Sequence, residues 1–101
     1  MKTYTGVRKL DAVAVKVDGM NLPPRHDIKH FGDGFDWGHS GSNSMQLALA
    51  ILADHLRDGT RALQVCEAFK FKVIAYLPDK EWKLTTAMID RYLEGMAPKA
   101  A

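Results

Sequence analysis

The chain has 101 residues, which is enough for one domain and too few for two independently folding cores. Hydrophobic residues make up 47% of it and charged residues 26%, a composition that fits an ordinary globular domain and excludes a disordered, collagen-like or membrane protein. The net charge of +2 is too small to indicate a polyanion binder or an acidic DNA mimic. We expect one domain over residues 1–96 and a flexible tail over residues 97–101.

The N-terminal segment is typical of a β-hairpin. Val13, Val15 and Val17 alternate with smaller or charged residues, which is the period-2 pattern of a half-buried strand. Asp18–Gly19 predicts a turn at the end of this strand. We expect residues 4–7 to pair with it in an antiparallel hairpin.

Residues 21–42 are expected to be mostly irregular. Pro23 and Pro24 cannot continue a hydrogen-bonded ladder, because proline lacks the backbone N–H. Phe35 and Trp37 are compatible with a short strand. Four glycines surround them: Gly32, Gly34, Gly38 and Gly41. A loop this long inside a small domain is unusual and is often functional.

A central helix over residues 43–57 is the clearest predicted element. Nearly every residue from 45 to 53 is apolar and a strong helix former, so this helix should be covered on several sides. Asn43 is expected to cap its start, with Gln46 closing a capping box. Gly59 is expected to take the left-handed position at its end.

Two further helices are predicted. Thr60 is expected to cap a helix whose apolar residues recur at helical spacing up to Leu77, where Pro78 ends it. A strand over residues 69–73 is the alternative. Thr85 is expected to cap a short third helix, with Gly95 just past its end. These elements predict an α+β fold, in which an N-terminal β-hairpin or small antiparallel sheet packs on two to three helices, one of them central and apolar.

The cysteine content and the N-terminus indicate the compartment. Cys66 is the only cysteine, so it cannot form an internal disulfide, and its place on an apolar helix stripe predicts a buried core residue. The N-terminal residues lack the apolar stretch of a signal peptide, and no run approaches the length of a membrane span. We therefore expect a cytoplasmic protein with no membrane partner.

Glycine and serine residues run directly into the start of the central helix, where free N–H groups and the helix dipole favour an anion. The residues that would bind a phosphate or carboxylate there are Gly38, Ser40, Gly41, Ser42 and Asn43. The segment matches neither the P-loop nor the dinucleotide-binding pattern, and its spacing differs from that of a hydrolase nucleophile elbow. We favour the alternative, in which the glycines allow a tight turn and Ser42 or Asn43 caps the helix.

The histidines suggest a metal site only weakly. His26 and His30 are four residues apart and would share one face of a helix, as two zinc ligands do. Prolines precede this pair, glycines follow it, and the chain has a single cysteine. We expect no metal site, no cofactor and no catalytic residue.

Charge is distributed unevenly along the chain. Residues 1–30 carry six Lys/Arg and three Asp, whereas residues 31–60 carry one Arg and four Asp. The acidic residues around the glycine segment would repel a phosphate. The basic candidate patch lies among aromatic residues and consists of Lys70, Lys72, Lys80 and Lys83. We favour a solvated helix face there over a surface for single-stranded nucleic acid, so nucleic acid is a less favoured partner.

Residues 35–52 read Phe-Asp-Trp-Gly-His-Ser-Gly-Ser-Asn-Ser-Met-Gln-Leu-Ala-Leu-Ala-Ile-Leu. This run resembles the motif F-x-W-G-Y-x-G-S-G-P-A-Q-L-A-L-A-I-L of an uncharacterised family of small proteins encoded by bacteria, plasmids and phages. The resemblance covers most of the chain and includes Tyr4, Gly6, Val17–Gly19, Leu22–Arg25, Phe69–Lys70, Leu77–Pro78 and Trp82–Thr85. His39 replaces the tyrosine of the motif, and Asn43–Ser44 replaces Gly-Pro, which is also a favoured helix start.

The family implies a genetic setting and no activity. Small proteins of mobile elements often bind and block a host protein, so the analogy of setting implies a non-enzymatic inhibitor of a host defence complex such as a CRISPR effector. We expect the loop over residues 26–42 to contact this host protein complex, with its aromatic residues as exposed anchors. The candidate contact residues are His26, Phe31, Phe35, Asp36, Trp37 and His39. The competing hypothesis is the anion or nucleotide site described above.

Overall fold

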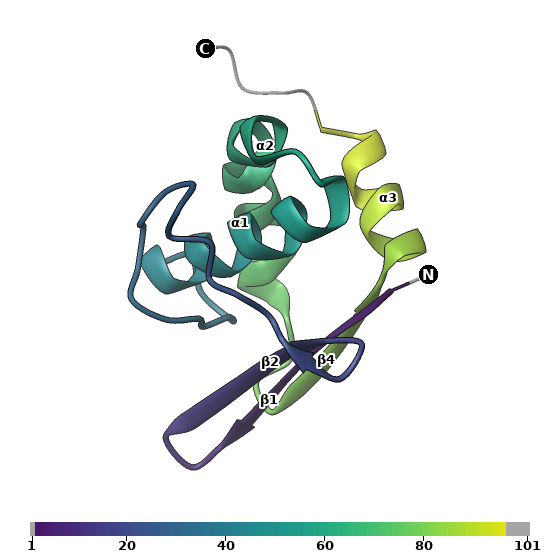
Figure 1. Cartoon of the computed structure of the whole chain (residues 1–101). Helices are drawn as coiled ribbons and strands as arrows, with labels where there is room; N and C mark the ends of the chain where they lie inside the picture. Colours follow the sequence, from purple (N-terminus) through teal and green to yellow (C-terminus); the bar gives the residue numbers. More distant parts are fainter. Residues whose placement is uncertain (1, 97–101) are drawn as a thin grey trace.

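The strands and helices form two layers in the computed structural model, which describes residues 2–96 (Figure 1). The sheet contains β1 (Thr3–Lys9), β2 (Ala12–Val17), the short β3 (Met20–Asn21) and β4 (Glu81–Thr85). The helices are α1 (Ser42–Leu56), α2 (Gly59–Lys72) and α3 (Thr86–Glu94), and a 3-10 turn, η1 (Ile74–Tyr76), follows α2. The predicted α+β fold with a small antiparallel sheet is confirmed. The predicted tail, residues 97–101, lies outside the described residues.

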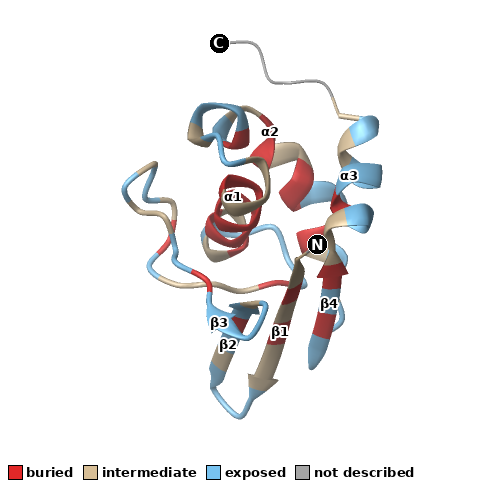
Figure 2. Ribbon diagram, turned by 45° about the vertical axis from the view of Figure 1, so that its right-hand side comes forward, coloured by how far each residue is buried: buried red, intermediate tan, exposed pale blue. Residues whose placement is uncertain are grey.

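The sheet has the strand order β3-β2-β1-β4, and all neighbouring strands are antiparallel. The predicted hairpin of β1 and β2 is confirmed, with Tyr4 opposite Val17. Asp18 and Gly19 form the predicted turn with left-handed backbone, at φ values of 49° and 83°. The chain then adds β3 beside β2 before it enters the long loop. Strand β4 lies on the other side of β1 and forms one edge of the sheet (Figure 2).

Strand β4 corrects the prediction from sequence, which contains no strand at this position. Trp82 and Leu84 are buried and their neighbours are not, so the segment does follow the strand period. Five residues are too few for this alternation to identify a strand without its partner. The partner is β1, where Gly6 lies opposite Trp82. A β-carbon on Gly6 would overlap the Trp82 indole, so the pairing requires a glycine there.

Helix α1 lies at the centre of the core. Every residue from Gln46 to Ala53 is buried, as the uninterrupted apolar run predicts. The predicted cap is wrong, because Gly41 is the N-cap residue and Asn43 lies within the first turn. The predicted capping box is also wrong, because the Gln46 side chain bonds to the preceding loop instead. Helix α1 therefore carries one buried amide, that of Gln46, among mostly apolar buried side chains.

The junction between α1 and α2 differs from the prediction by a few residues. Arg57, with φ of 53°, takes the left-handed position after α1, and Gly59 is the first residue of α2. Asp58 caps α2 in place of Thr60, because its carboxylate accepts a hydrogen bond from the Arg61 N–H at 3.1 Å. None of the helices within residues 2–96 is long and apolar enough to span a membrane.

The C-terminal elements follow the predicted order. Helix α2 ends at Lys72, before the predicted Leu77, and the alternative strand over residues 69–73 is wrong. Cys66 is buried as predicted, and burial raises the pKa of its thiol to about 11. Thr85 caps α3 by accepting a hydrogen bond from the Met88 N–H, so the third predicted cap is confirmed.

Candidate functional site

One buried side chain fixes the loop between β3 and α1, residues 22–41. The Oε1 atom of Gln46, which is wholly buried, accepts hydrogen bonds from the backbone N–H groups of Phe31 at 2.7 Å and Gly32 at 3.1 Å. Its Nε2 atom donates to the backbone carbonyls of Pro24 at 2.6 Å and Lys29 at 3.1 Å. Buried backbone groups require partners, so this one amide determines the path of the first half of the loop.

Trp37 fixes the second half of the loop. Its Nε1 atom donates to the backbone carbonyls of Pro78 at 2.9 Å and Asp79 at 3.0 Å, in the turn before β4. Its ring packs edge to face against Trp82, with ring centroids 5.7 Å apart. The prediction of Trp37 as an exposed anchor is therefore wrong. The residue is 2% exposed, because its ring fills the space between the loop and β4.

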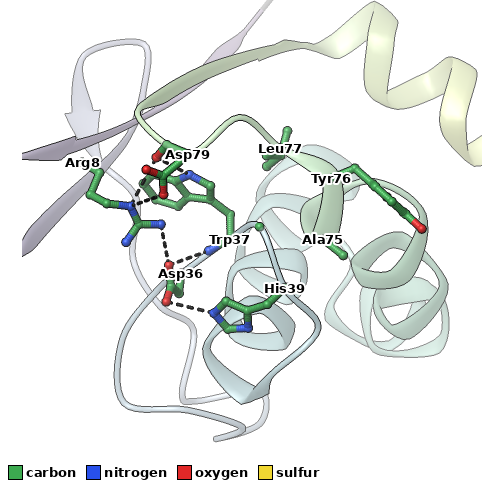
Figure 3. A pocket seen from close by; sticks show the side chains of 9 residues that line it. Arg8, Asp36, Trp37, His39, Ala75, Tyr76, Leu77 and Asp79 are labelled. Atoms are coloured by element: carbon green, nitrogen blue, oxygen red, sulfur yellow. Dashed lines mark hydrogen bonds and ion pairs between the residues drawn. The ribbon is translucent and has the colours of Figure 1, made fainter.

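Arg8 on β1 connects this half of the loop to the turn before β4 (Figure 3). Its Nη2 atom donates to Oδ1 of Asp36 at 2.7 Å, and its Nε atom lies 3.2 Å from both the carbonyl and the carboxylate of Asp79. Its guanidinium lies 4.6 Å from the centroid of the Trp37 ring. Oδ2 of Asp36 accepts a hydrogen bond from Nε2 of His39 at 2.9 Å. We call Arg8, Asp36, His39 and Asp79 the Arg8 cluster.

The Arg8 cluster keeps Asp36 ionised. Desolvation by burial pushes the pKa of Asp36 up, but hydrogen bonds from His39 and Arg8 outweigh this effect and lower the pKa to about 2. The hydrogen bond to Asp36 in turn raises the pKa of Arg8. Nδ1 of His39 accepts a hydrogen bond from the Gly41 N–H at 3.0 Å. The proton of the neutral ring therefore lies on Nε2, the atom that faces Asp36.

An open cavity of about 460 Å³ lies beside the Arg8 cluster. Its walls carry Arg8, Asp36 and His39 together with Ala75 and Tyr76 of η1 (Figure 3). Tyr76 is 81% exposed, so it stands at the rim and not in the core. The lining combines one cation, carboxylates and apolar surface, which suits a polar side chain of a partner better than an apolar ligand.

Asp36, His39 and Ser44 follow one another as the acid, histidine and serine of a catalytic triad do, but their geometry is not that of a triad. The Ser44 hydroxyl lies 3.5 Å from Nδ1 of His39, and Asp36 lies on the other side of the ring. Ser44 is fully buried within α1, and the N–H of Gly41 is closer to Nδ1 than the hydroxyl is. This serine is not accessible to a substrate, so the arrangement does not suit nucleophilic attack by Ser44.

The other predicted contact residues are His26, Phe31 and Phe35, which do not belong to the Arg8 cluster. The His26 ring stacks on His30, with centroids 4.0 Å apart, and its Nε2 lies 2.8 Å from the Gly32 carbonyl. Phe31 and Phe35 are half-buried and pack against the core. The structure thus joins Trp37 and His39 to Asp36 by hydrogen bonds, whereas His26 contacts Gly32 and the Phe31 N–H bonds to Gln46. Within residues 2–96, no group of three or more His, Cys, Asp or Glu side chains is placed to hold a metal ion.

The predicted anion-binding segment forms the exposed start of α1. Gly38, Ser40, Gly41 and Ser42 are exposed. Among the described residues no side chain caps the helix, so the predicted capping by Ser42 or Asn43 is wrong. Asn43 Oδ1 instead lies 3.5 Å from the Gly34 N–H. The free N–H groups of this turn favour an anion, whereas the ionised carboxylate of Asp36 opposes one.

Basic residues near the N-terminus form ion pairs with acidic residues of the central segment. Lys2 forms an ion pair with Asp54 at 3.1 Å, and Arg8 forms one with Asp36 at 2.7 Å. The Tyr4 hydroxyl donates to the same Asp54 carboxylate at 2.6 Å, and burial together with this bond raises the pKa of Tyr4. The basic N-terminal residues thus neutralise much of the acidic central segment.

The basic candidate patch does not form one helix face. Lys70 and Lys72 belong to α2, whereas Lys80 and Lys83 belong to the turn before β4 and to β4 itself. Lys70 is only 7% exposed, and its ammonium group lies 4.1 Å from the centroid of the Phe71 ring. The prediction of a single solvated helix face is therefore wrong for these lysines.

Three site residues were not predicted from the sequence: Arg8, Asp79 and Gln46. Arg8 and Asp79 carry no local signal, because their contacts depend on the pairing of β1 with β4. Gln46 did carry a signal, since an amide in an uninterrupted apolar helix has to find partners. The predicted capping box gave the Gln46 side chain a partner nearby in the sequence. The path of the loop, which was not predictable, shows that Gln46 bonds to the loop instead.

Comparisons with known proteins identify a family and no function. A search of curated proteins and a search of solved structures found no match. Residues 4–95 match the family described as a family of unknown function, DUF6166. This range includes every strand and helix of the fold except the first residue of β1, as well as the Arg8 cluster and the loop. The chain therefore belongs to the DUF6166 family.

Proposed function

We propose that the protein is a non-enzymatic binding module that recognises a partner protein through the loop of residues 22–41 and the cavity beside the Arg8 cluster. The observation that carries this proposal is the fixed conformation of a long irregular loop. Gln46 holds its first half with four hydrogen bonds, and Trp37 and Arg8 hold its second half. A loop ordered before binding loses little further entropy on association, so it can bind tightly through a small area.

The exposed side chains of the loop are polar and charged. His30, Asp33, His39 and Ser40 face solvent, and the half-buried Phe31 presents part of its ring. Such a surface, with a cavity at one end, fits a partner that offers complementary charges and a protruding polar side chain. The exposed carboxylate of Asp33, which lies 2.8 Å from Nε2 of His30, makes nucleic acid the less favoured partner.

The more specific proposal concerns the partner. We infer that the protein acts in the cytoplasm as a phage- or plasmid-encoded inhibitor of a host defence complex, such as a CRISPR effector. The small size, the ordered loop and the genetic setting of the family that the sequence resembles support this proposal. Binding without catalysis suffices for such inhibition, because a loop docked on the effector can exclude its nucleic acid or its nuclease partner.

The test compares three forms of the protein in bacteria with an active CRISPR system. Wild type should lower the interference against a targeted plasmid and should purify together with the effector. The double variant His39→Ala/Asp33→Ala changes the loop and should lose both properties. The double variant Lys9→Ala/Asp11→Ala changes equally exposed residues at the tip of the β1–β2 hairpin and should retain them. If wild type leaves interference unchanged and captures no stable partner, the proposal is wrong.

An anion site at residues 38–43 is the second candidate, because no side chain from residues 2–96 caps the first turn of α1. NMR titration with phosphate and with nucleotides distinguishes the two functions. An anion site predicts saturable shifts of the Gly38, Gly41 and Ser42 amide signals. If these signals do not move at millimolar ligand, this second candidate is excluded.

A further inference from the structure

In the part of the chain that the structure describes, strand β4 has a partner strand on one side only. The sheet order places β4 at an edge, and β1 is its neighbour on the other side. The Arg8 N–H donates to the Lys80 carbonyl, and the Thr86 N–H donates to the Lys2 carbonyl. In an antiparallel pair the residues that bond to the neighbour alternate with residues that point away from it. The even-numbered residues of β4 therefore bond to β1, and Glu81 and Lys83 direct their N–H and C=O groups to the open edge.

The two residues with free backbone groups carry opposite charges. Glu81 and Lys83 are both exposed, and among residues 2–96 neither has an ion-pair partner within 4.0 Å. Both side chains lie on the face of the sheet away from the helices, since Trp82 and Leu84 point inward. This edge has the composition that a second copy of itself would complement.

We propose that two copies of the chain pair through their β4 edges as an antiparallel, symmetric dimer. In the register that places Trp82 opposite Trp82, each Glu81 lies opposite Lys83 of the other copy. All free N–H and C=O groups of these two residues are then used in four hydrogen bonds across the interface. Two symmetric Glu81–Lys83 ion pairs form in the same register. A shift by one pair in either direction would set Lys83 opposite Lys83 or Glu81 opposite Glu81, so charge selects the register.

Apolar side chains beside this edge would be covered by the same association. A groove of about 270 Å³ runs along β4 between η1 and α3. Tyr76, Met88 and Tyr92 line it and are 81%, 40% and 42% exposed. In the proposed register the start of α3 in one copy lies near residues 77–78 of the other, so these side chains would meet across the two-fold axis. Open sheet edges with adjacent apolar surface are the places where β-sheet proteins associate.

The experiment measures the monomer–dimer equilibrium of the full chain by analytical ultracentrifugation from about 1 to 500 µM. Wild type should dimerise within this range. Glu81→Lys and Lys83→Glu each replace two ion pairs by two like-charge contacts and should raise the dimer Kd about tenfold. The double variant Glu81→Lys/Lys83→Glu restores complementary pairs and should return the Kd to within about threefold of wild type. Lys16→Glu, on the same face but on β2, is the matched control and should leave the Kd unchanged.

A backbone variant tests the edge independently of charge. Lys83→Pro removes an N–H that does not bond to β1, and proline is tolerated on edge strands, so the fold should survive as judged by circular dichroism while dimerisation is lost. If this variant does not fold, the charge variants decide. A wild-type chain that stays monomeric at 500 µM overturns the proposal, and so does a double reversal that binds no better than the single ones. A monomer whose Glu81 and Lys83 amides respond to an added extended peptide would assign the edge to another partner.

Discussion

At the scale of single residues, the Gln46 amide combines two roles that apolar side chains cannot supply. Its oxygen and nitrogen satisfy four backbone groups of a loop that comes from a different part of the chain. Apart from Ser44 and Gln46, the buried residues of α1 are apolar, so they offer these backbone groups no alternative partner. Position 46 therefore requires an amide, and an apolar residue of the same volume cannot replace it.

Replacing Gln46 by leucine should lower the free energy of unfolding by about 3 kcal/mol, because the four backbone N–H and C=O groups that bond to its amide lose their partner. Gln46→Glu should be destabilising as well, since a carboxylate cannot donate to the carbonyls of Pro24 and Lys29. Urea denaturation measures both changes. Gln64→Leu, at a half-buried position of α2, is the control and should change stability by less than about 1 kcal/mol. Equal losses at Gln46 and Gln64 would contradict this role.

Asp36 predicts a pH dependence of stability. Its pKa in the folded protein is lowered to about 2, below the value of about 3.9 in an unfolded chain. The unfolded state therefore binds the proton first, and Asp36 stabilises the fold above about pH 4 and loses this contribution as the pH falls towards 2. The effect should amount to about 1–2 kcal/mol, since the side chain is 31% exposed.

Denaturation of wild type and Asp36→Asn at several pH values isolates this contribution. The difference in stability between the two proteins should shrink between pH 4 and pH 2. Asp33→Asn changes a carboxylate whose side chain is 98% exposed and serves as the control. A constant difference down to pH 2 would show that Asp36 does not stabilise the fold through its charge.

At the scale of elements, the sequence predicts the strands and helices that have a local residue pattern. It does not predict those that depend on a partner far away in the sequence. The hairpin, α1 and the Thr85 cap follow from alternation, from apolar content and from one side chain beside a helix start. Strand β4 and Arg8 could not be predicted, because β4 becomes a strand only where β1 lies beside it. Trp37 was misplaced for the same reason, since the carbonyls that bind its indole N–H come from the turn before β4.

The contact between Gly6 and Trp82 gives a prediction for this pairing of elements. Gly6→Ala should destabilise the protein by about 2 kcal/mol, because the added methyl group overlaps the indole ring. Gly34→Ala is the matched control, since a β-carbon there meets no atom within 4 Å. Thermal denaturation measures both changes. Combining Gly6→Ala with Trp82→Leu should cost less than the sum of the two single changes, and strict additivity would contradict the contact.

At the scale of the whole molecule, the first and last strands of the sheet are neighbours. Residues 3–7 of β1 pair with residues 81–85 of β4, so the sheet is complete only with the C-terminal part of the chain. The loop also depends on that part, because Trp37 and Arg8 bond to the turn that contains Asp79. The candidate site is therefore a property of the complete fold and not of the loop alone.

A chain that ends at Pro78 should lack a cooperative thermal transition, although the α1 and α2 segments should retain some helix. It loses β4, α3 and part of the Trp37 environment together. Adding a peptide of residues 79–96 should restore the transition, whereas the same peptide with Trp82→Ala should restore less. Circular dichroism during heating measures all three samples. A cooperative transition in the truncated chain alone would show that β1 does not need β4.

The edge-to-face contact between Trp37 and Trp82 has a consequence for how the protein can be observed. The chain has two tryptophans, and both lie where β1, the loop and β4 converge. Tryptophan fluorescence is therefore a signal from this one junction, while far-ultraviolet circular dichroism is dominated by α1 and α2. Coincident transitions by the two signals would mean that junction and helices form in one step. If circular dichroism recovers before fluorescence during refolding, the helices form first and the candidate site assembles last.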